Sequence, residues 1–121
     1  MILYHFTSRH HVKGCFTEGI RLGVVPVNFG KLLPGYQWLT TSPEFGQSWN
    51  AMSSLPYDRC EFRLKIEVPK GLSRKVLVWL DVCKRLSDIH GDLNAFGDPE
   101  NWRLFKGAIQ PHWIKEIARK Q

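Results

Sequence analysis

Residues 3–8 read LYHFTS, and with Ile2 before them they predict a β-strand over residues 2–7. Side chains of a strand point to opposite faces at every second residue. Ile2, Tyr4 and Phe6 would therefore share one face, and Leu3, His5 and Thr7 the other. A histidine and a hydroxyl would lie side by side on the second face. These two polar side chains either form a site in a cleft or simply lie on the edge of a strand.

A short helix is expected directly after this strand, over residues 9–19. Ser8 is a suitable N-cap, because its side-chain oxygen can accept a hydrogen bond from a free N–H of the first helical turn. Val12 and Phe16 are four residues apart and would bury one face of the helix. Gly19 follows as the C-cap glycine.

The next segment, residues 20–35, is rich in Gly and Pro and predicts a long, functional loop. YQWLTTS, residues 36–42, predicts a second strand. Ser42 and Pro43 then form a typical helix start, with proline at the first helical position. The apolar positions of this second helix would be Phe45, Trp49 and Met52.

The second half of the chain is expected to be mostly strand. CEFRLKIEV, residues 60–68, has the clearest alternation, and Pro69 ends it. Glu61 and Glu67 are expected to be exposed on this strand. VLVWL, residues 76–80, is either a buried strand or the start of a helix. The remaining segments are a helical stretch within 81–95 around Val82 and Leu86, a strand at 101–109 and a last strand at 112–117.

This order of elements predicts an α+β fold. Strands and helices do not alternate as regular βαβ units, which excludes a doubly wound parallel sheet. The 121 residues form one domain, 1–121, with 43% hydrophobic and 23% charged residues. A chain of this size can bury a core without disulfides or metals.

Seventeen Lys and Arg against eleven Asp and Glu give a net charge of +6, which favours polyanionic or phosphate-bearing partners. Five Trp in a small domain are core residues or a surface that stacks on a flat ligand. Three cysteines without a CxxC motif argue against a disulfide framework and indicate a reducing compartment. No signal peptide and no apolar run of about 20 residues is found. We therefore expect a cytoplasmic protein without a membrane partner.

Two kinds of site are not expected from the residues. A metal site would need paired ligands, whereas His10 and Cys15 form a single, isolated pair. Nucleophilic catalysis by Cys15 is not expected, because Cys15 would lie on the apolar face of its helix, where cysteines are inert.

The residues do offer an anion site, where the hydroxyls of residues 36–42 meet a helix N-terminus. Alternatively, Ser42 only caps that helix.

The order of these motifs resembles the ADP-ribosyltransferase fold, in its diphtheria-toxin-type branch. The resemblance rests on His5 in LYHFTS, TEGI at 17–20, WLTTSP at 38–43 and FKGAIQPHWIKEI at 105–117. Within that branch, the chain is similar to DNA ADP-ribosyltransferase toxins and RNA 2′-phosphotransferases. The resemblance implies two small, mainly antiparallel sheets with short flanking helices, and NAD as a substrate.

The resemblance also implies roles for individual residues. His5 would act as a catalytic residue and, with Thr7, contact NAD. Hydroxyls at the end of the second strand would lie below the nicotinamide, and Trp38 or Tyr36 would stack on it. The complete NAD-binding set is His5, Thr7, Tyr36, Trp38, Thr40, Thr41, Ser42, Arg63 and Trp102.

The family's catalytic acid, which usually begins a late strand, has no clear counterpart here. Glu100 is the nearest acid and precedes the strand expected at 101–109. Without an acid, Arg9, Arg63 and Arg103 would be candidates to clamp a phosphate, as in 2′-phosphotransferases.

Three functions therefore remain open. The first is transfer of ADP-ribose from NAD to a nucleic acid or a protein, as in a toxin or a phage–host conflict factor. The second is a catalytically inactive module that binds a nucleotide or a protein. The third is a basic nucleic-acid-binding domain.

Overall fold

A computed structural model describes residues 1–26, 32–47, 56–85 and 97–121. The strands are β1 (Ile2–Thr7), β2 (Val24–Pro26), β3 (Leu32–Pro34), β4 (Tyr36–Thr40), β5 (Phe62–Glu67), β6 (Val76–Val78), β7 (Trp102–Lys106) and β8 (Ile114–Arg119). The helices are α1 (Val12–Thr17), α2 (Trp79–Arg85) and the 3-10 turns η3 (Lys70–Lys75), η5 (Pro99–Asn101) and η6 (Pro111–Trp113).

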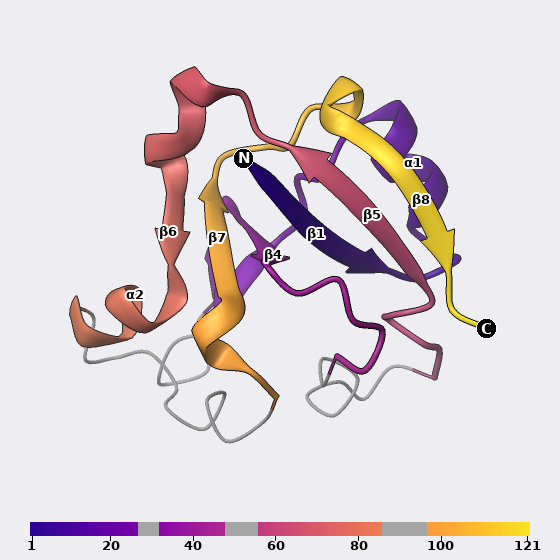
Figure 1. The fold of residues 1–121 in the computed structure, drawn as a ribbon, viewed down its shortest axis with the longest axis horizontal. Coiled ribbons are helices and arrows are strands. Elements are labelled where there is room, and N and C mark those ends of the chain that lie inside the picture. Colours follow the sequence, from indigo (N-terminus) through magenta and orange to yellow (C-terminus); the bar gives the residue numbers. More distant parts are fainter. Residues whose placement is uncertain (27–31, 48–55, 86–96) are drawn as a thin grey trace.

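The strands form two antiparallel sheets (Figure 1). Six of them lie in the order β6-β7-β4-β1-β5-β8, and β2 pairs separately with β3. The α+β class and the antiparallel pairing are thus confirmed. The described residues form two sheets, as expected, but one of them is not small, because strands from both halves of the chain join it.

The first strand occupies the middle of the large sheet, but its two neighbours hold it unequally. β1 pairs with β5 along all six of its residues, from Ile2 opposite Glu67 to Thr7 opposite Phe62. On the other side, β1 and β4 share only the pair Tyr4 and Thr40. The sheet is therefore continuous from β1 to β8 and joined at a single point between β1 and β4.

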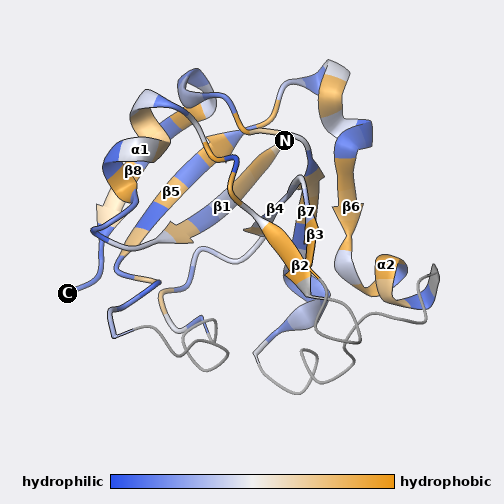
Figure 2. Ribbon diagram, turned by 180° about the vertical axis from the view of Figure 1, so that it is seen from behind, coloured by the Kyte–Doolittle hydropathy of each residue, from blue (hydrophilic) through white to orange (hydrophobic). Residues whose placement is uncertain are grey.

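Each face of the large sheet carries its own apolar cluster. On the face of Leu3, the cluster includes Leu39, Leu64, Ile66 and Phe105 together with Cys15 of α1 and Trp113 of η6. On the opposite face, Trp102 and Leu104 of β7 pack with Val25 of β2 and Trp79 of α2. Figure 2 shows the alternation of hydrophilic and hydrophobic residues along β5.

Several local predictions about the first helix need correction. α1 begins at Val12 with His11 at its N-cap, so Ser8 does not cap it. Instead, the Ser8 carbonyl accepts the N–H groups of His11 and Val12 and closes a turn before the helix. Phe16 is exposed, because only one side of this short helix meets the sheet. Gly19 ends the helix at a φ of 90°, as predicted.

Other differences concern segments that the sequence predicted to be a loop or a helix. The loop expected at 20–35 contains the β2–β3 hairpin. Residues 43–47 are not helical, and the rest of that expected helix, with Trp49 and Met52, lies outside the described residues. VLVWL contains both predicted alternatives, since β6 ends at Val78 and α2 begins at Trp79. Leu86 lies outside the described residues.

Candidate functional site

His5 lies in the middle of β1 and is partly exposed. Its Nδ1 is 2.9 Å from the carbonyl oxygen of Trp38 on β4. A carbonyl oxygen only accepts hydrogen bonds, so Nδ1 carries the hydrogen and donates it. Nε2 of the neutral ring is then the acceptor. The Trp38 carbonyl thus fixes both the tautomer and the orientation of the imidazole.

The environment keeps this imidazole neutral. Burial lowers the pKa of His5 below its usual value of 6.5, the hydrogen bond to Trp38 opposes this effect, and the positive charge of Arg59 adds to the lowering. A buried cation is disfavoured because it loses hydration. At neutral pH, His5 therefore presents an unprotonated nitrogen, which is suited to accept a hydrogen bond from a hydroxyl.

The position of His5 coincides with the place where β1 and β4 part. Beyond the pair of Tyr4 and Thr40, the two strands share no further ladder pair. The side chain of His5 reaches across the gap and bonds the Trp38 carbonyl, an acceptor that a continuous ladder would give to a backbone N–H. A side chain thus contacts a backbone carbonyl of β4 at this point, beside the last ladder pair of the two strands.

The predicted NAD-binding residues do not share one face of the sheet. Tyr4 opposes Thr40 in the register, so the side chains of β4 at even positions lie on the face opposite His5. His5 and Thr7 occupy the face of α1. The opposite face carries Tyr36, Trp38, Thr40, Arg63 and Trp102.

The predicted hydroxyls are used within the protein. Thr7 is 6% exposed and hydrogen-bonds the thiol of Cys15, whose pKa is raised by burial. Thr40 is fully buried, and its Oγ1 accepts the N–H of Ser42 at 3.0 Å. Thr41 donates to Asn101 Oδ1 at 2.8 Å. The hydroxyls of Thr40 and Thr41 thus stabilise the end of β4 and the turn after it, whereas that of Thr7 joins β1 to α1.

The anion site expected at the end of this strand does not form in the predicted way. It depended on a helix starting at Pro43, and residues 43–47 are not helical. Ser42 Oγ instead accepts the N–H of Glu44 and Nε2 of Gln47, both at 3.3 Å. Ser42 thus stabilises a local turn, and the helix N-terminus on which the anion site depended is not formed.

Three tryptophans pack together on the face opposite His5. The ring centroids are 4.9 Å apart for Trp38 and Trp79, 5.9 Å for Trp38 and Trp102 and 6.4 Å for Trp79 and Trp102. The indole of Trp38 donates to the Val24 carbonyl at 2.8 Å, which ties β2 to β4. Among the described residues, the buried indole N–H of Trp102 has no hydrogen-bond partner.

The three arginines of the predicted phosphate clamp have different partners, and only Arg103 contacts the predicted acid, at its backbone carbonyl. Glu100 lies in η5, directly before β7, and is exposed. Arg103 donates to the carbonyls of Glu100 and Trp102, both at 3.0 Å. Arg63 donates to the Pro43 carbonyl at 2.8 Å. Because each guanidinium has its own local acceptor, Arg63 and Arg103 do not converge with Arg9.

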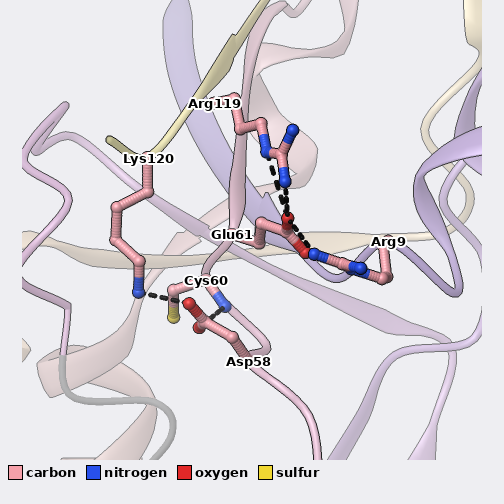
Figure 3. Close-up of polar contacts among 6 residues, drawn as sticks. All are labelled: Arg9, Asp58, Cys60, Glu61, Arg119 and Lys120. Carbon is pink, nitrogen blue, oxygen red and sulfur yellow. Dashed lines mark hydrogen bonds and ion pairs between the residues drawn. The ribbon is translucent and has the colours of Figure 1, made fainter.

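Arg9 belongs to an ion-pair cluster that the sequence pattern did not predict (Figure 3). Its Nε and Nη2 each donate to the carboxylate of Glu61 at 2.9 Å. Arg119 of β8 donates from Nε to the same carboxylate at 3.1 Å, and its Nη2 forms an ion pair with that carboxylate at 3.0 Å. The expectation that Glu61 is exposed is wrong, because two guanidinium groups cover it and leave it 8% exposed. Glu67 is exposed as expected.

Within the described ranges, no group of three or more His, Cys, Asp or Glu residues is placed to hold a metal ion. In the same part of the chain, no helix is long and apolar enough to cross a membrane. No protein-family model, curated protein or solved structure matches the chain. The proposals below therefore rest on the geometry of the residues themselves.

Proposed function

We propose that this protein binds NAD or a related nucleotide between β1 and β4, as a small ADP-ribosyltransferase-like protein. The observation that carries the proposal is the state of His5. Its Nδ1–H is held by the Trp38 carbonyl and its pKa is lowered, so that Nε2 is an oriented acceptor. A ribose hydroxyl is a donor of the right kind for this nitrogen. Transfer of ADP-ribose to a macromolecule is the activity that the motif order suggests.

Binding without transfer is the second candidate. β7 begins with Trp102, and the nearest acid, Glu100, lies in η5 with an exposed side chain. An oxocarbenium-like transition state needs a carboxylate at the ribose for stabilisation. A protein that holds the nucleotide but offers no such carboxylate would sequester it without cleaving it.

The decisive experiment is calorimetric titration of NAD and of ADP-ribose into wild type, His5→Asn and His112→Ala, with nicotinamide release followed in the same samples. Asparagine at position 5 keeps a donor for the Trp38 carbonyl and removes the Nε2 acceptor. We expect wild type to bind the nucleotide and His5→Asn to bind it about tenfold or more weakly. This loss of affinity corresponds to about one hydrogen bond between neutral groups. His112 is exposed, so His112→Ala should bind normally.

The outcomes separate the candidates. Nicotinamide release that disappears in Glu100→Gln would identify an active transferase with Glu100 as its acid. Binding without release would favour the module that sequesters the nucleotide. If wild type binds neither NAD nor ADP-ribose, or if His5→Asn binds both as well as wild type does, the proposed function is wrong.

A further inference from the structure

A second site lies where β1 ends, β5 begins and β8 ends. The surface there is hollowed by a shallow cavity of about 610 Å³, whose lining includes Arg9, His10, Tyr57, Glu61, Arg119 and Lys120. None of these residues takes part in the contacts of His5 described above. Figure 3 shows that the charged side chains of this cavity come from three separate segments of the chain.

Glu61 orients the guanidinium groups of Arg9 and Arg119 but leaves part of each group free to donate further hydrogen bonds. Glu61 accepts hydrogen bonds from Nε and Nη2 of Arg9 and from Nε of Arg119 at 2.9–3.1 Å, and it forms an ion pair with Nη2 of Arg119 at 3.0 Å. Among the described residues, no hydrogen bond uses Nη1 of Arg9 or of Arg119. A guanidinium fixed by a carboxylate loses less conformational entropy when it binds a further anion. The cluster is therefore a pair of pre-oriented donors.

The charge that this cluster presents to solvent is positive. The side chain of Glu61 is 11% exposed, whereas those of Arg9 and Arg119 are both 64% exposed. Lys120, 40% exposed, pairs with Asp58 at the rim of the same cavity. The side chain of Asp58 is 30% exposed and balances the charge of Lys120. The excess positive charge is therefore that of the two guanidinium groups, which lie above Glu61 and favour an anion.

A pair of rings accompanies the cations. The centroids of His10 and Tyr57 are 4.4 Å apart, and both residues line the cavity. Cations beside flat rings fit the repeating unit of a nucleic acid, in which each base is attached to a phosphate. Exposed bases are available for such contacts only in a single strand. The net charge of +6 would favour the approach of this polyanion.

We propose that the Arg9–Glu61–Arg119 cluster binds a phosphate of a single-stranded nucleic acid, with an adjacent base on the His10–Tyr57 rings. The proposal deepens the proposed function, and rests on it only in assigning this strand as the acceptor of ADP-ribose. Arg9 follows His5 by four residues, so their Cα atoms are at most about 14 Å apart. One strand could therefore occupy the cluster and reach a nucleotide held at His5.

The test is fluorescence anisotropy with a short labelled oligothymidylate over a range of salt concentrations. In Arg9→Gln/Arg119→Gln we expect about tenfold weaker binding and a slope of log K against log salt that is smaller by about 0.7 for the lost phosphate contact. The matched control is Lys70→Gln/Arg74→Gln, which removes two exposed charges in η3, at the opposite end of β5. Its binding should stay within about twofold of wild type.

Two further variants keep the result interpretable. Arg9→Lys/Arg119→Lys preserves the charge and removes the planar fork of each guanidinium, so it should also weaken binding. This variant provides the test if the glutamine pair fails to fold. His5→Asn should bind the oligonucleotide as wild type does, and saturating NAD should not displace it. If wild type binds the oligonucleotide but neither NAD nor ADP-ribose, the proposed function is wrong and this site stands.

Three outcomes would overturn the proposal. The first is no oligonucleotide binding by wild type at low salt. The second is an equal loss in the arginine pair and in the η3 pair, which would mean that only net charge matters. The third is displacement of the oligonucleotide by NAD or its loss in His5→Asn, which would place the strand at His5 instead.

Discussion

Replacing Gln37 with leucine tests how the hairpin and the large sheet are held together. Gln37 lies in β4 and is 1% exposed. Its Oε1 accepts the N–H of Gly23 at 2.8 Å, and its Nε2 donates to the carbonyl of Gly107 at 3.0 Å. One buried amide thus joins the segment before β2 to the end of β7. Leucine has a similar volume and can make neither bond.

The expected loss follows from these two bonds. Leaving a buried donor or acceptor without a partner costs about 1–3 kcal/mol for each group. The apolar side chain of leucine returns about 1–2 kcal/mol through its own burial. The net destabilisation should therefore be about 1–4 kcal/mol. For a domain of this size, that lowers Tm by about 4–16 °C.

Urea and thermal unfolding of wild type, Gln37→Leu and Gln110→Leu would measure this loss. Gln110 is exposed, so the same substitution there should change the unfolding free energy by less than about 0.5 kcal/mol. A loss below about 1 kcal/mol in Gln37→Leu would refute the reasoning. It would mean that Gly23 and Gly107 find other partners without this amide.

Three further predictions concern Gly19, Glu61 and His5. Gly19 has a φ of 90°, and a Cβ built there would lie 2.2 Å from the Ile109 carbonyl oxygen, so Gly19→Ala should cost more than about 2 kcal/mol in urea unfolding. Gly14→Ala, where a Cβ meets nothing within 4 Å, is the control and should be neutral or stabilising; equal effects would contradict the argument. The pKa of Glu61 is lowered, first by its hydrogen bond to Arg9. Its contribution to stability is therefore present above the usual value of 4.5 and is lost as the pH falls through the lowered pKa, so Glu61→Gln should flatten the acid limb of the stability profile. An unchanged limb would show that the pair contributes nothing. The pKa of His5 is also lowered, by burial, so stability should decline as the pH falls below 6.5, and its imidazole should titrate below 6.5 by NMR. A midpoint at or above 6.5 would be inconsistent with the buried, neutral ring.

The strands were the most predictable part of this fold. Alternation identified β1 and β5 within one or two residues, because one-sided burial imposes a period of two on the sequence itself. The glycine at the end of α1 was also predictable, since few other residues adopt a positive φ. The helix expected at Pro43 failed, because a capping signal is compatible with a turn and needs tertiary packing to become a helix.

The two sites differ in how far a sequence pattern could find them. His5 stood out because it is the one titratable imidazole within a mostly apolar strand. Glu61 gave no signal, because it occupies a polar position in an alternating strand and its partners are 52 and 58 residues away. The division of the predicted NAD-binding residues between two faces was likewise invisible. It depends on the register of β1 against β4, which is a relation between strands.

The sequence by itself determined the α+β class, the positions of the main strands, the excess of positive charge and the singular position of His5. These are local or compositional properties, written into periods, turn residues and counts. Only the tertiary structure decided the strand order, the parting of β1 from β4 and the meeting of Arg9, Glu61 and Arg119. Such features arise when distant segments pair, and the free energy that selects the pairing comes from burial and hydrogen bonding across the whole sheet.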